Sequence, residues 1–290
     1  MAFLRTARCW LVRALTVTTA VTGLALSAHA QERVGFASLD RPVQVVGFLF
    51  EASGAAKAPA VVMLHGCGGP YNKAGALSQR STDYARLLNE HGMHALVLDS
   101  LTPRGERELC TQRLGQRKVT QANRRLDALA AIDWLAQRER VDAQRIGLLG
   151  WSNGGSTVLA TINAVRQPGD AQGAQLATFA VAFYPGCEAD LKRGFSTDVP
   201  LLMLVGEADD WTPAAPCHAL ARSGGGRAAQ IEGYAGAYHG FASTGPGSHR
   251  RDVPNGVHPG AGVHVGGNEA AREASQRRLL KFLADPLASR

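Results

Sequence analysis

Short apolar runs recur along the chain, and segments of mixed polar and apolar character separate them. One such run, "PAVVML" at residues 59–64, leads directly into "HGCGG". Continuous runs of this kind are typical of strands buried on both faces of a parallel sheet. They predict strands at 59–64, 94–100, 145–150, 177–185 and 199–207, with two earlier strands at 34–39 and 43–51 and a short later one at 227–234.

The segments between these runs predict amphipathic helices. In residues 118–138, Leu126, Leu129 and Trp134 share one helical face, whereas the charged residues lie elsewhere, Arg124 among them. Further helices are predicted at 80–91, 153–166, 214–222 and 267–284. Strands that alternate with helices predict an α/β fold with a doubly wound, mostly parallel central sheet flanked by helices.

The sequence has no internal repeat, block of charge or linker that would divide it. We therefore expect residues 31–290 to form a single domain. The long irregular segment 243–266 is rich in glycine, proline and histidine, and a loop or lid at the rim of the domain would suit it.

The N-terminus has the three parts of a secretory signal peptide. Basic residues come first, the apolar stretch 14–26 follows, and Ala-His-Ala at 28–30 provides a cleavage site. The alternative is a retained membrane anchor, but about 13 apolar residues fall short of the roughly 20 that span a bilayer. Cysteine does not follow the cleavage site, so a lipoprotein signal is not indicated. We predict that residues 1–30 are removed and that the rest is periplasmic or secreted, without a membrane anchor.

Composition and charge narrow the function classes. Of the 290 residues, 45% are hydrophobic and 19% charged, which indicates a folded core rather than disorder. The net charge of +7 falls to +4 when the three arginines of the predicted signal peptide are lost. With no basic cluster interleaved with aromatic residues, the sequence gives no case for binding nucleic acid.

The stretch "GLLGWSNGGSTVL" at 147–159 places Ser152 between Gly150 and Gly154, where a strand changes into a helix. The structural interpretation is a turn that needs glycine for close packing. The functional interpretation is a nucleophile elbow, in which G-x-S-x-G exposes a serine hydroxyl on a strained turn. The rest of the chain decides between them.

A catalytic triad is predicted by the order of three residues. Ser152, Asp209 in "GEADDWTP" and His239 in "YAGAYHGF" each follow a predicted strand, in the order typical of α/β-hydrolases. Such positions meet at the carboxyl edge of an open sheet. Asp210 is the alternative acid, although it could instead cap the helix that begins near Pro213.

The oxyanion of the tetrahedral intermediate needs backbone N–H donors. We expect one from Asn153, which follows the nucleophile, and the other from Cys67 in the loop after "VVMLHG", with Gly68 as the second choice. Gly66 and Gly69 would let that loop turn sharply beside the acyl group.

These motifs together resemble the dienelactone hydrolase family of α/β-hydrolases over nearly the whole chain after residue 30. The resemblance rests on "LHGCGG", "LDS" before an arginine-rich stretch, "GWSNGG", "GEADDWTP" and "AYHGF". It implies hydrolysis of a small-molecule ester or lactone through an acyl-enzyme, without a cofactor. Dienelactone hydrolase itself has a cysteine nucleophile where this chain has Ser152, so its substrate is not implied.

Other residues near these motifs have two interpretations each. Trp151 and Tyr238 adjoin the triad and could line the acyl pocket, but packing accounts for them equally well. We expect structural roles for three histidines, namely His65, His91 and His94. Wide spacing makes a metal site improbable for another three, namely His249, His258 and His264, and no metal is predicted.

The cysteines agree with export. Cys9 leaves with the signal peptide, and an even number remains. In an α/β-hydrolase sheet the third and fourth strands are neighbours, as are the sixth and seventh, and their following loops open at one edge. This topology predicts the disulfides Cys67–Cys110 and Cys187–Cys217.

Two further functions use a similar fold. A serine peptidase acting on short peptides would share the triad, and a secreted non-catalytic binding protein would be expected to lack one of its members. Ester hydrolysis is favoured over the binding protein because all three triad positions are occupied. It is favoured over the peptidase because such enzymes usually carry an extra domain that selects short peptides, for which we expect no room in residues 31–290. The sequence leaves open the acyl chain length, acyl transfer to an alcohol and the oligomeric state.

Overall fold

The structure is a computed structural model that describes Met1 and residues 31–54, 56–166 and 177–288. Apart from Met1, the predicted signal peptide lies outside the described residues. Within them, eight strands form the central sheet: β1 (Gln31–Ala37), β2 (Gln44–Phe50), β3 (Ala58–Leu64), β4 (His94–Asp99), β5 (Val141–Trp151), β6 (Ala180–Phe183), β8 (Leu201–Gly206) and β10 (Gln230–Tyr234).

The sheet is mostly parallel. Its spatial order is β1-β2-β4-β3-β5-β6-β8-β10. Strand β2 pairs antiparallel with both β1 and β4, and the strands from β4 to β10 pair in parallel. Short strands form two further pairs among the described residues, β7 (Ser196–Thr197) with β9 (Gly225–Gly226) and β11 (Ser248–Arg250) with β12 (Val263–Val265).

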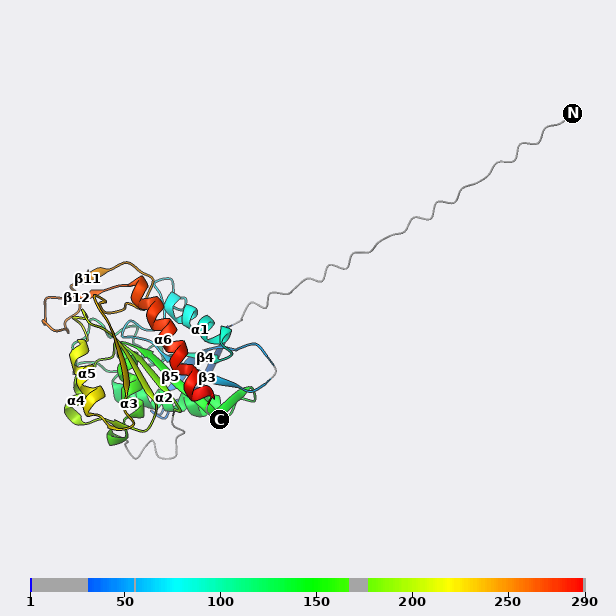
Figure 1. Ribbon diagram of the computed structural model, residues 1–290, viewed down its shortest axis with the longest axis horizontal. Coiled ribbons are helices and arrows are strands. Elements are labelled where there is room, and N and C mark those ends of the chain that lie inside the picture. The colour runs from blue at the N-terminus through cyan, green and yellow to red at the C-terminus, as the bar shows by residue number, and fades with distance from the viewer. Residues whose placement is uncertain (2–30, 55, 167–176, 289–290) are drawn as a thin grey trace.

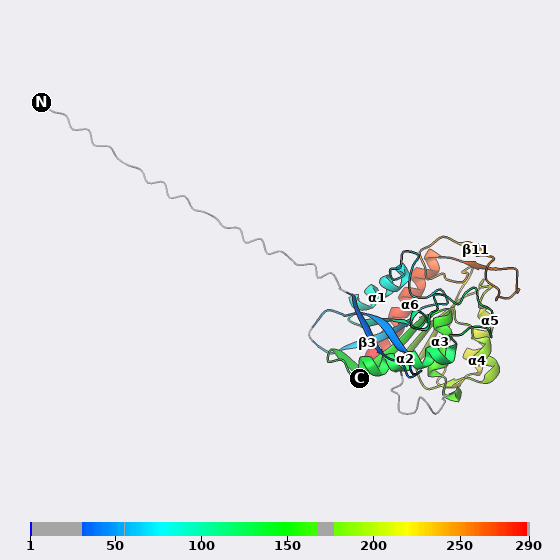
Figure 2. The same ribbon diagram turned by 180° about the vertical axis from the view of Figure 1, so that it is seen from behind.

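Helices cover both faces of the sheet. They are α1 (Gln79–Glu90), α2 (Gln121–Ala136), α3 (Asn153–Ile162), α4 (Glu188–Arg193), α5 (Ala214–Ser223) and α6 (Glu269–Ala288), with the short 3-10 helices η1 (Thr102–Arg104) and η2 (Ala164–Arg166). Helices α1 and α6 lie over the face turned to the viewer in Figure 1, and α2 and α3 lie over the opposite face, seen in Figure 2. The fold is therefore the predicted α/β fold with a mostly parallel sheet flanked by helices.

Two buried apolar clusters lie on the two faces of this sheet. Leu88 of α1 and Leu283 of α6 belong to one cluster, and Leu135 of α2 and Val158 of α3 belong to the other. The strands contribute alternate residues to the two sides, as in Val62 and Met63 of β3. Burial on both faces explains why central strands such as β3 and β8 are apolar without interruption.

Helix α2 differs from its prediction as a helix with an exposed polar face. It begins after Thr120, whose side chain forms a capping box with Asn123. Its charged residues Arg124, Arg125 and Asp127 are nevertheless buried. The physical reason is that segments distant in sequence cover this side of the helix and supply polar partners, so burial does not require an apolar side chain.

The segment 243–266 is less irregular than predicted, because it contains the β11–β12 hairpin. Gly266 at the end of β12 donates its N–H to the carbonyl oxygen of His239, over 2.9 Å. The hairpin lies at the rim of the molecule (Figure 1). The short helix α4 was not predicted either, and α2 and α3 are shorter at one or both ends than the sequence pattern indicated. No helix among the described residues is both long and apolar enough to pass through a bilayer.

Candidate active site

The turn at Ser152 has the geometry expected of a nucleophile elbow. Ser152 joins β5 to α3 with φ 55° and ψ −119°, a backbone conformation that residues other than glycine rarely adopt. A Cβ atom at Gly150 would collide with the carbonyl group of Gly154, and one at Gly154 would collide with the carbonyl oxygen of Leu64. Both glycines of the motif are therefore required by close backbone contacts, which hold the strained serine in place.

The structure brings the three predicted triad residues within hydrogen-bonding distance. The Ser152 hydroxyl lies 2.8 Å from Nε2 of His239, and Nδ1 of His239 lies 2.7 Å from Oδ2 of Asp209. His239 and Asp209 are both almost completely buried. With Nδ1–H donating to the carboxylate, Nε2 is free to accept the serine proton.

The Asp209 carboxylate is held by the loop that follows β8. Its Oδ1 accepts the backbone N–H groups of Trp211 and Thr212, each over 2.8 Å, which leaves Oδ2 directed to His239. The Thr212 hydroxyl lies 3.1 Å from Oδ2 and donates to the carbonyl oxygen of Tyr184 over 3.0 Å. Thr212 was not predicted, although an Asp side chain that accepts the backbone N–H two residues on, as Asp209 does from Trp211, is a common local turn.

Asp210 has a different partner, and its predicted role as a helix cap is wrong. Oδ1 of Asp210 accepts the backbone N–H of His264 over 2.8 Å, and Oδ2 lies 2.6 Å from Nδ1 of the same histidine. Helix α5 begins after Pro213 without any side-chain cap. Asp210 therefore fastens β12 to the loop that carries Asp209.

The predicted oxyanion donors lie beside the nucleophile. Asn153 is the first residue of α3, where backbone N–H groups have no partner within the helix and carry the positive end of its dipole. A Cβ atom at Gly66 would lie 3.5 Å from Cβ of Ser152, so the loop carrying Cys67 runs directly past the serine. In the described part of the chain, neither the Asn153 nor the Cys67 N–H donates to a protein group. The N–H of Gly68, the second choice, likewise donates to no backbone acceptor in this part of the chain.

Both expected disulfides are present in the structure. Cys67 is bonded to Cys110, with 5.0 Å between the Cα atoms, and Cys187 to Cys217, with 5.1 Å. The first joins the loop after β3 to the segment after β4. The carbonyl oxygen of Cys67 also accepts the N–H of Leu109 over 2.7 Å, so the loop is held at two points.

The two aromatic residues proposed for the acyl pocket have different surroundings. Trp151 is 1% exposed and packs against Tyr84 and Phe183, with ring centroids 5.0 and 5.9 Å away, so packing accounts for it. Tyr238 is 43% exposed and faces a surface hollow. Residues of the β11–β12 hairpin and the segment 266–268 line this hollow, and no triad residue does among those described.

Two aromatic residues that the sequence did not point to flank the triad histidine. The ring of Trp211 lies 4.7 Å from that of His239, centroid to centroid, and the ring of Tyr184 lies 4.9 Å away. Tyr184 is buried and also has a positive φ, 37°. Burial raises the pKa of its hydroxyl to about 12, so it is a neutral phenol at physiological pH. Trp211 is two residues from Asp209, but its direction depends on the folded loop.

The three histidines for which structural roles were expected have structural contacts. Nδ1 of His65 donates to the carbonyl oxygen of Gly66 over 2.7 Å, and burial, then the charge of Arg124, lowers its pKa well below the ordinary value. His94 lies between the Ala52 N–H and the Arg140 carbonyl oxygen. His91 contacts the last turn of its own helix. Across the described ranges no three His, Cys, Asp or Glu side chains gather as metal ligands would.

Comparison with known proteins identifies similar sequences and folds. The sequence profile of the dienelactone hydrolase family matches residues 45–287. No curated protein matches the chain in sequence. Solved structures match at the level of fold, and three of them follow.

A dienelactone hydrolase from Anabaena variabilis is 18% identical, with a TM-score of 0.60 over 88% of this chain and 97% of its own. Thermogutta terrifontis esterase 2, in a form phosphorylated by paraoxon, is 19% identical, with a TM-score of 0.57 over 88% of this chain and 94% of its own. Porphyromonas gingivalis dipeptidyl peptidase 4 is 18% identical, with a TM-score of 0.59 over 89% of this chain but only 35% of its own.

Proposed function

This chain belongs to the dienelactone hydrolase family of carboxylic ester hydrolases, and we propose that it cleaves esters or lactones through an acyl-enzyme formed on Ser152. The observation that carries the proposal is the chain of two hydrogen bonds from Ser152 through His239 to Asp209. A serine hydroxyl is a weak nucleophile until a base accepts its proton, and this arrangement supplies the base and its orienting acid.

Acylation follows from this geometry. Nε2 of His239 accepts the proton of Ser152 while Oγ attacks the ester carbonyl carbon, and the carbonyl oxygen becomes an oxyanion beside the N–H groups of Asn153 and Cys67. The carbon–oxygen bond to the alcohol then breaks, and the imidazolium of His239 returns the proton to the departing alkoxide. The products of this step are an alcohol and an acyl ester of Ser152.

Deacylation repeats the sequence with water. His239 removes a proton from water as the hydroxide attacks the acyl carbon, a second oxyanion forms, and the proton passes to Ser152 as the carboxylic acid leaves. Asp209 stays ionised throughout and stabilises the imidazolium. No step requires a cofactor.

The direct test is the replacement of the proposed nucleophile. Ser152→Ala is expected to lower kcat for p-nitrophenyl esters by at least about 1,000-fold, because the residual rate depends only on binding and the oxyanion donors. A fluorophosphonate probe should label the unchanged protein at Ser152; Thermogutta terrifontis esterase 2 is similarly described as phosphorylated by paraoxon.

The matched control is Ser156→Ala, one turn further along α3. Its hydroxyl accepts the N–H of Gly186 over 2.9 Å, so this change is expected to lower stability while activity and labelling persist. Labelling at another residue, or full turnover in Ser152→Ala, would show the assignment to be wrong. Aminoacyl anilides in the same assay separate an esterase from a peptidase, since a peptidase would cleave them at comparable rates.

The protein is also proposed to act outside the cytoplasm as a single domain of residues 31–290. Two disulfides support this, because such bonds persist in oxidising compartments. Strand β1 begins at Gln31, directly after the predicted cleavage site, so removal of residues 1–30 would leave every described strand whole.

A further inference from the structure

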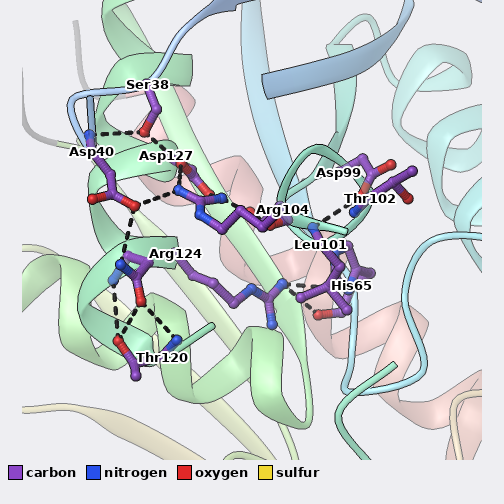
Figure 3. A network of polar contacts seen from close by, with 12 residues as sticks. Ser38, Asp40, His65, Asp99, Leu101, Thr102, Arg104, Thr120, Arg124 and Asp127 are labelled. Carbon is purple, nitrogen blue, oxygen red and sulfur yellow. Dashed lines mark hydrogen bonds and ion pairs between the residues drawn. The ribbon is translucent and has the colours of Figure 1, made fainter. Parts of the chain in front are cut away.

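Helix α2 carries a buried cation that the proposed mechanism does not use. The Arg124 side chain has no exposed surface, yet no carboxylate lies within ion-pair distance of it among the described residues. The neighbouring Arg104 differs, since its guanidinium binds Asp127 over 2.8 Å and Asp40 over 2.7 Å. Figure 3 shows the two arginines pointing to different partners, with Arg124 directed to His65. Burying a guanidinium without an acid partner is costly, so its contacts call for an explanation.

Those contacts join the two segments that carry the proposed oxyanion donors. Nη2 of Arg124 donates to the carbonyl oxygen of His65 over 2.7 Å, two residues before Cys67. Nη1 donates to Oδ1 of Asn153, the residue whose N–H is the other donor. Gln121, also on α2, donates to the carbonyl oxygen of Asn153 over 3.1 Å. Side chains of one helix, α2, therefore bind both the loop after β3 and the start of α3.

Arg124 also places a positive charge beside the two segments that carry the proposed oxyanion donors. Burial lowers the pKa of Arg124 to about 10, which leaves it protonated at neutral pH. The adjacent His65 is neutral there, because burial and the charge of Arg124 lower its pKa well below the ordinary value. The carboxylates of Asp127 and Asp99 compensate the guanidinium through space without a hydrogen bond to it.

We propose that Arg124 is a positioning residue for ester hydrolysis, which fixes the spacing of the Cys67 and Asn153 N–H groups and favours the negative charge that develops between them. This inference rests on the function proposed above. Oxyanion donors are effective only when they are held in place before the reaction, and a displacement of about 1 Å can cost about 100-fold in rate. A planar guanidinium can bridge two acceptors in fixed geometry, which a lysine cannot do.

The test compares Arg124→Met and Arg124→Lys with the matched control Arg104→Met. We expect kcat to fall about 100-fold in Arg124→Met with little change in KM, and by a smaller factor in Arg124→Lys. A trifluoromethyl ketone, which Ser152 converts into an oxyanion adduct, should lose affinity in parallel with kcat/KM. Arg104→Met breaks a buried ion pair but removes no contact with the segments that carry Cys67 and Asn153, since Arg104 binds Asp40, Asp127 and the carbonyl oxygen of Ser100. It should lower Tm while kcat and inhibitor affinity stay near the wild-type values.

Two results would overturn the proposal. One is an Arg124→Met protein that loses Tm but keeps kcat and ketone affinity, as the control does. The other concerns Asn153→Ala, which removes only the accepting amide and serves if Arg124→Met does not fold. It is expected to lower kcat about 10-fold, and the double variant with Arg124→Lys should lose less than the product of the two single losses, because the two changes share one contact; an unchanged kcat in Asn153→Ala would contradict the proposal. If the wild-type protein shows neither esterase activity nor labelling at Ser152, the proposed function is refuted, and this inference with it.

Discussion

At the scale of single residues, two adjacent aspartates with the same chemistry have different partners. Asp209 directs one oxygen to His239, and Asp210 binds both the N–H and the side chain of His264. Oδ1 of Asp209 accepts hydrogen bonds from the backbone N–H groups of Trp211 and Thr212. These bonds orient the Asp209 carboxylate, rather than that of Asp210, toward the imidazole. In the loop after β8, Asp209 therefore serves the proposed chemistry, and Asp210 binds the β11–β12 hairpin at the rim of the molecule.

Asp209→Asn is expected to lower kcat/KM by about four orders of magnitude, because an amide would favour the wrong imidazole tautomer. Asp210→Asn is the matched control, with the same change one residue away. It should stay within about 10-fold of the unchanged enzyme, since it weakens only the contact with His264. The measurement is kcat/KM with p-nitrophenyl butyrate, and equal losses in the two variants would contradict the assignment.

At the scale of elements, the loops after β3 and β4 behave as one unit. The Cys67–Cys110 bond and the Leu109–Cys67 hydrogen bond hold them together. Gly69, with φ 78°, packs so closely on the carbonyl oxygen of Arg107 that a Cβ atom could not be accommodated. The Cys187–Cys217 bond joins the segment after β6 to α5, eight residues beyond Asp209.

Replacing either disulfide by a pair of serines should lower the free energy of unfolding by about 3–4 kcal/mol in the chain-entropy model. The two pairs should differ in activity. The Cys67→Ser/Cys110→Ser protein should lose kcat in its folded state, because its oxyanion loop is released. The Cys187→Ser/Cys217→Ser protein should lose less, since the Asp209 loop has its own hydrogen bonds. Urea denaturation and kcat measured on the same samples test this, and equal kcat values in the two proteins would show that the first bond only stabilises.

At the scale of the whole molecule, the parallel sheet brings residues far apart in the chain to one edge. Ser152, Asp209 and His239 follow β5, β8 and β10, and Cys67 follows β3. Two buried apolar clusters pack the helices against the two faces of the sheet, and the β11–β12 hairpin lies at the rim. The predicted signal peptide would deliver this domain to a compartment in which both disulfides can form.

Expression of the full chain in a Gram-negative host tests that delivery. The protein recovered from the periplasm should begin at Gln31, as read by mass spectrometry of the intact chain. Ala30→Arg is the matched control, because a large charged residue should block cleavage at a site that needs small residues. A chain that keeps its N-terminus and stays in the cytoplasm would contradict the proposal.

The sequence by itself determined the order of the elements and the candidate chemistry. Local patterns indicate both, namely apolar runs, helical periodicity and the glycines around Ser152. It also predicted the disulfide partners, once the resemblance supplied the order of the strands. The same local patterns missed α4 and the β11–β12 hairpin, whose short segments have little periodicity of their own.

Only the tertiary structure decided which side chains meet. It placed Tyr184 and Trp211 beside His239, turned Asp210 to His264 and buried Arg124 against His65 and Asn153. In the sequence, Arg124 is one charge on the polar side of a helix, and its burial depends on segments 59 and 29 residues away. Such contacts follow from the packing of distant segments, and that packing leaves no periodic signal in the residues that it joins.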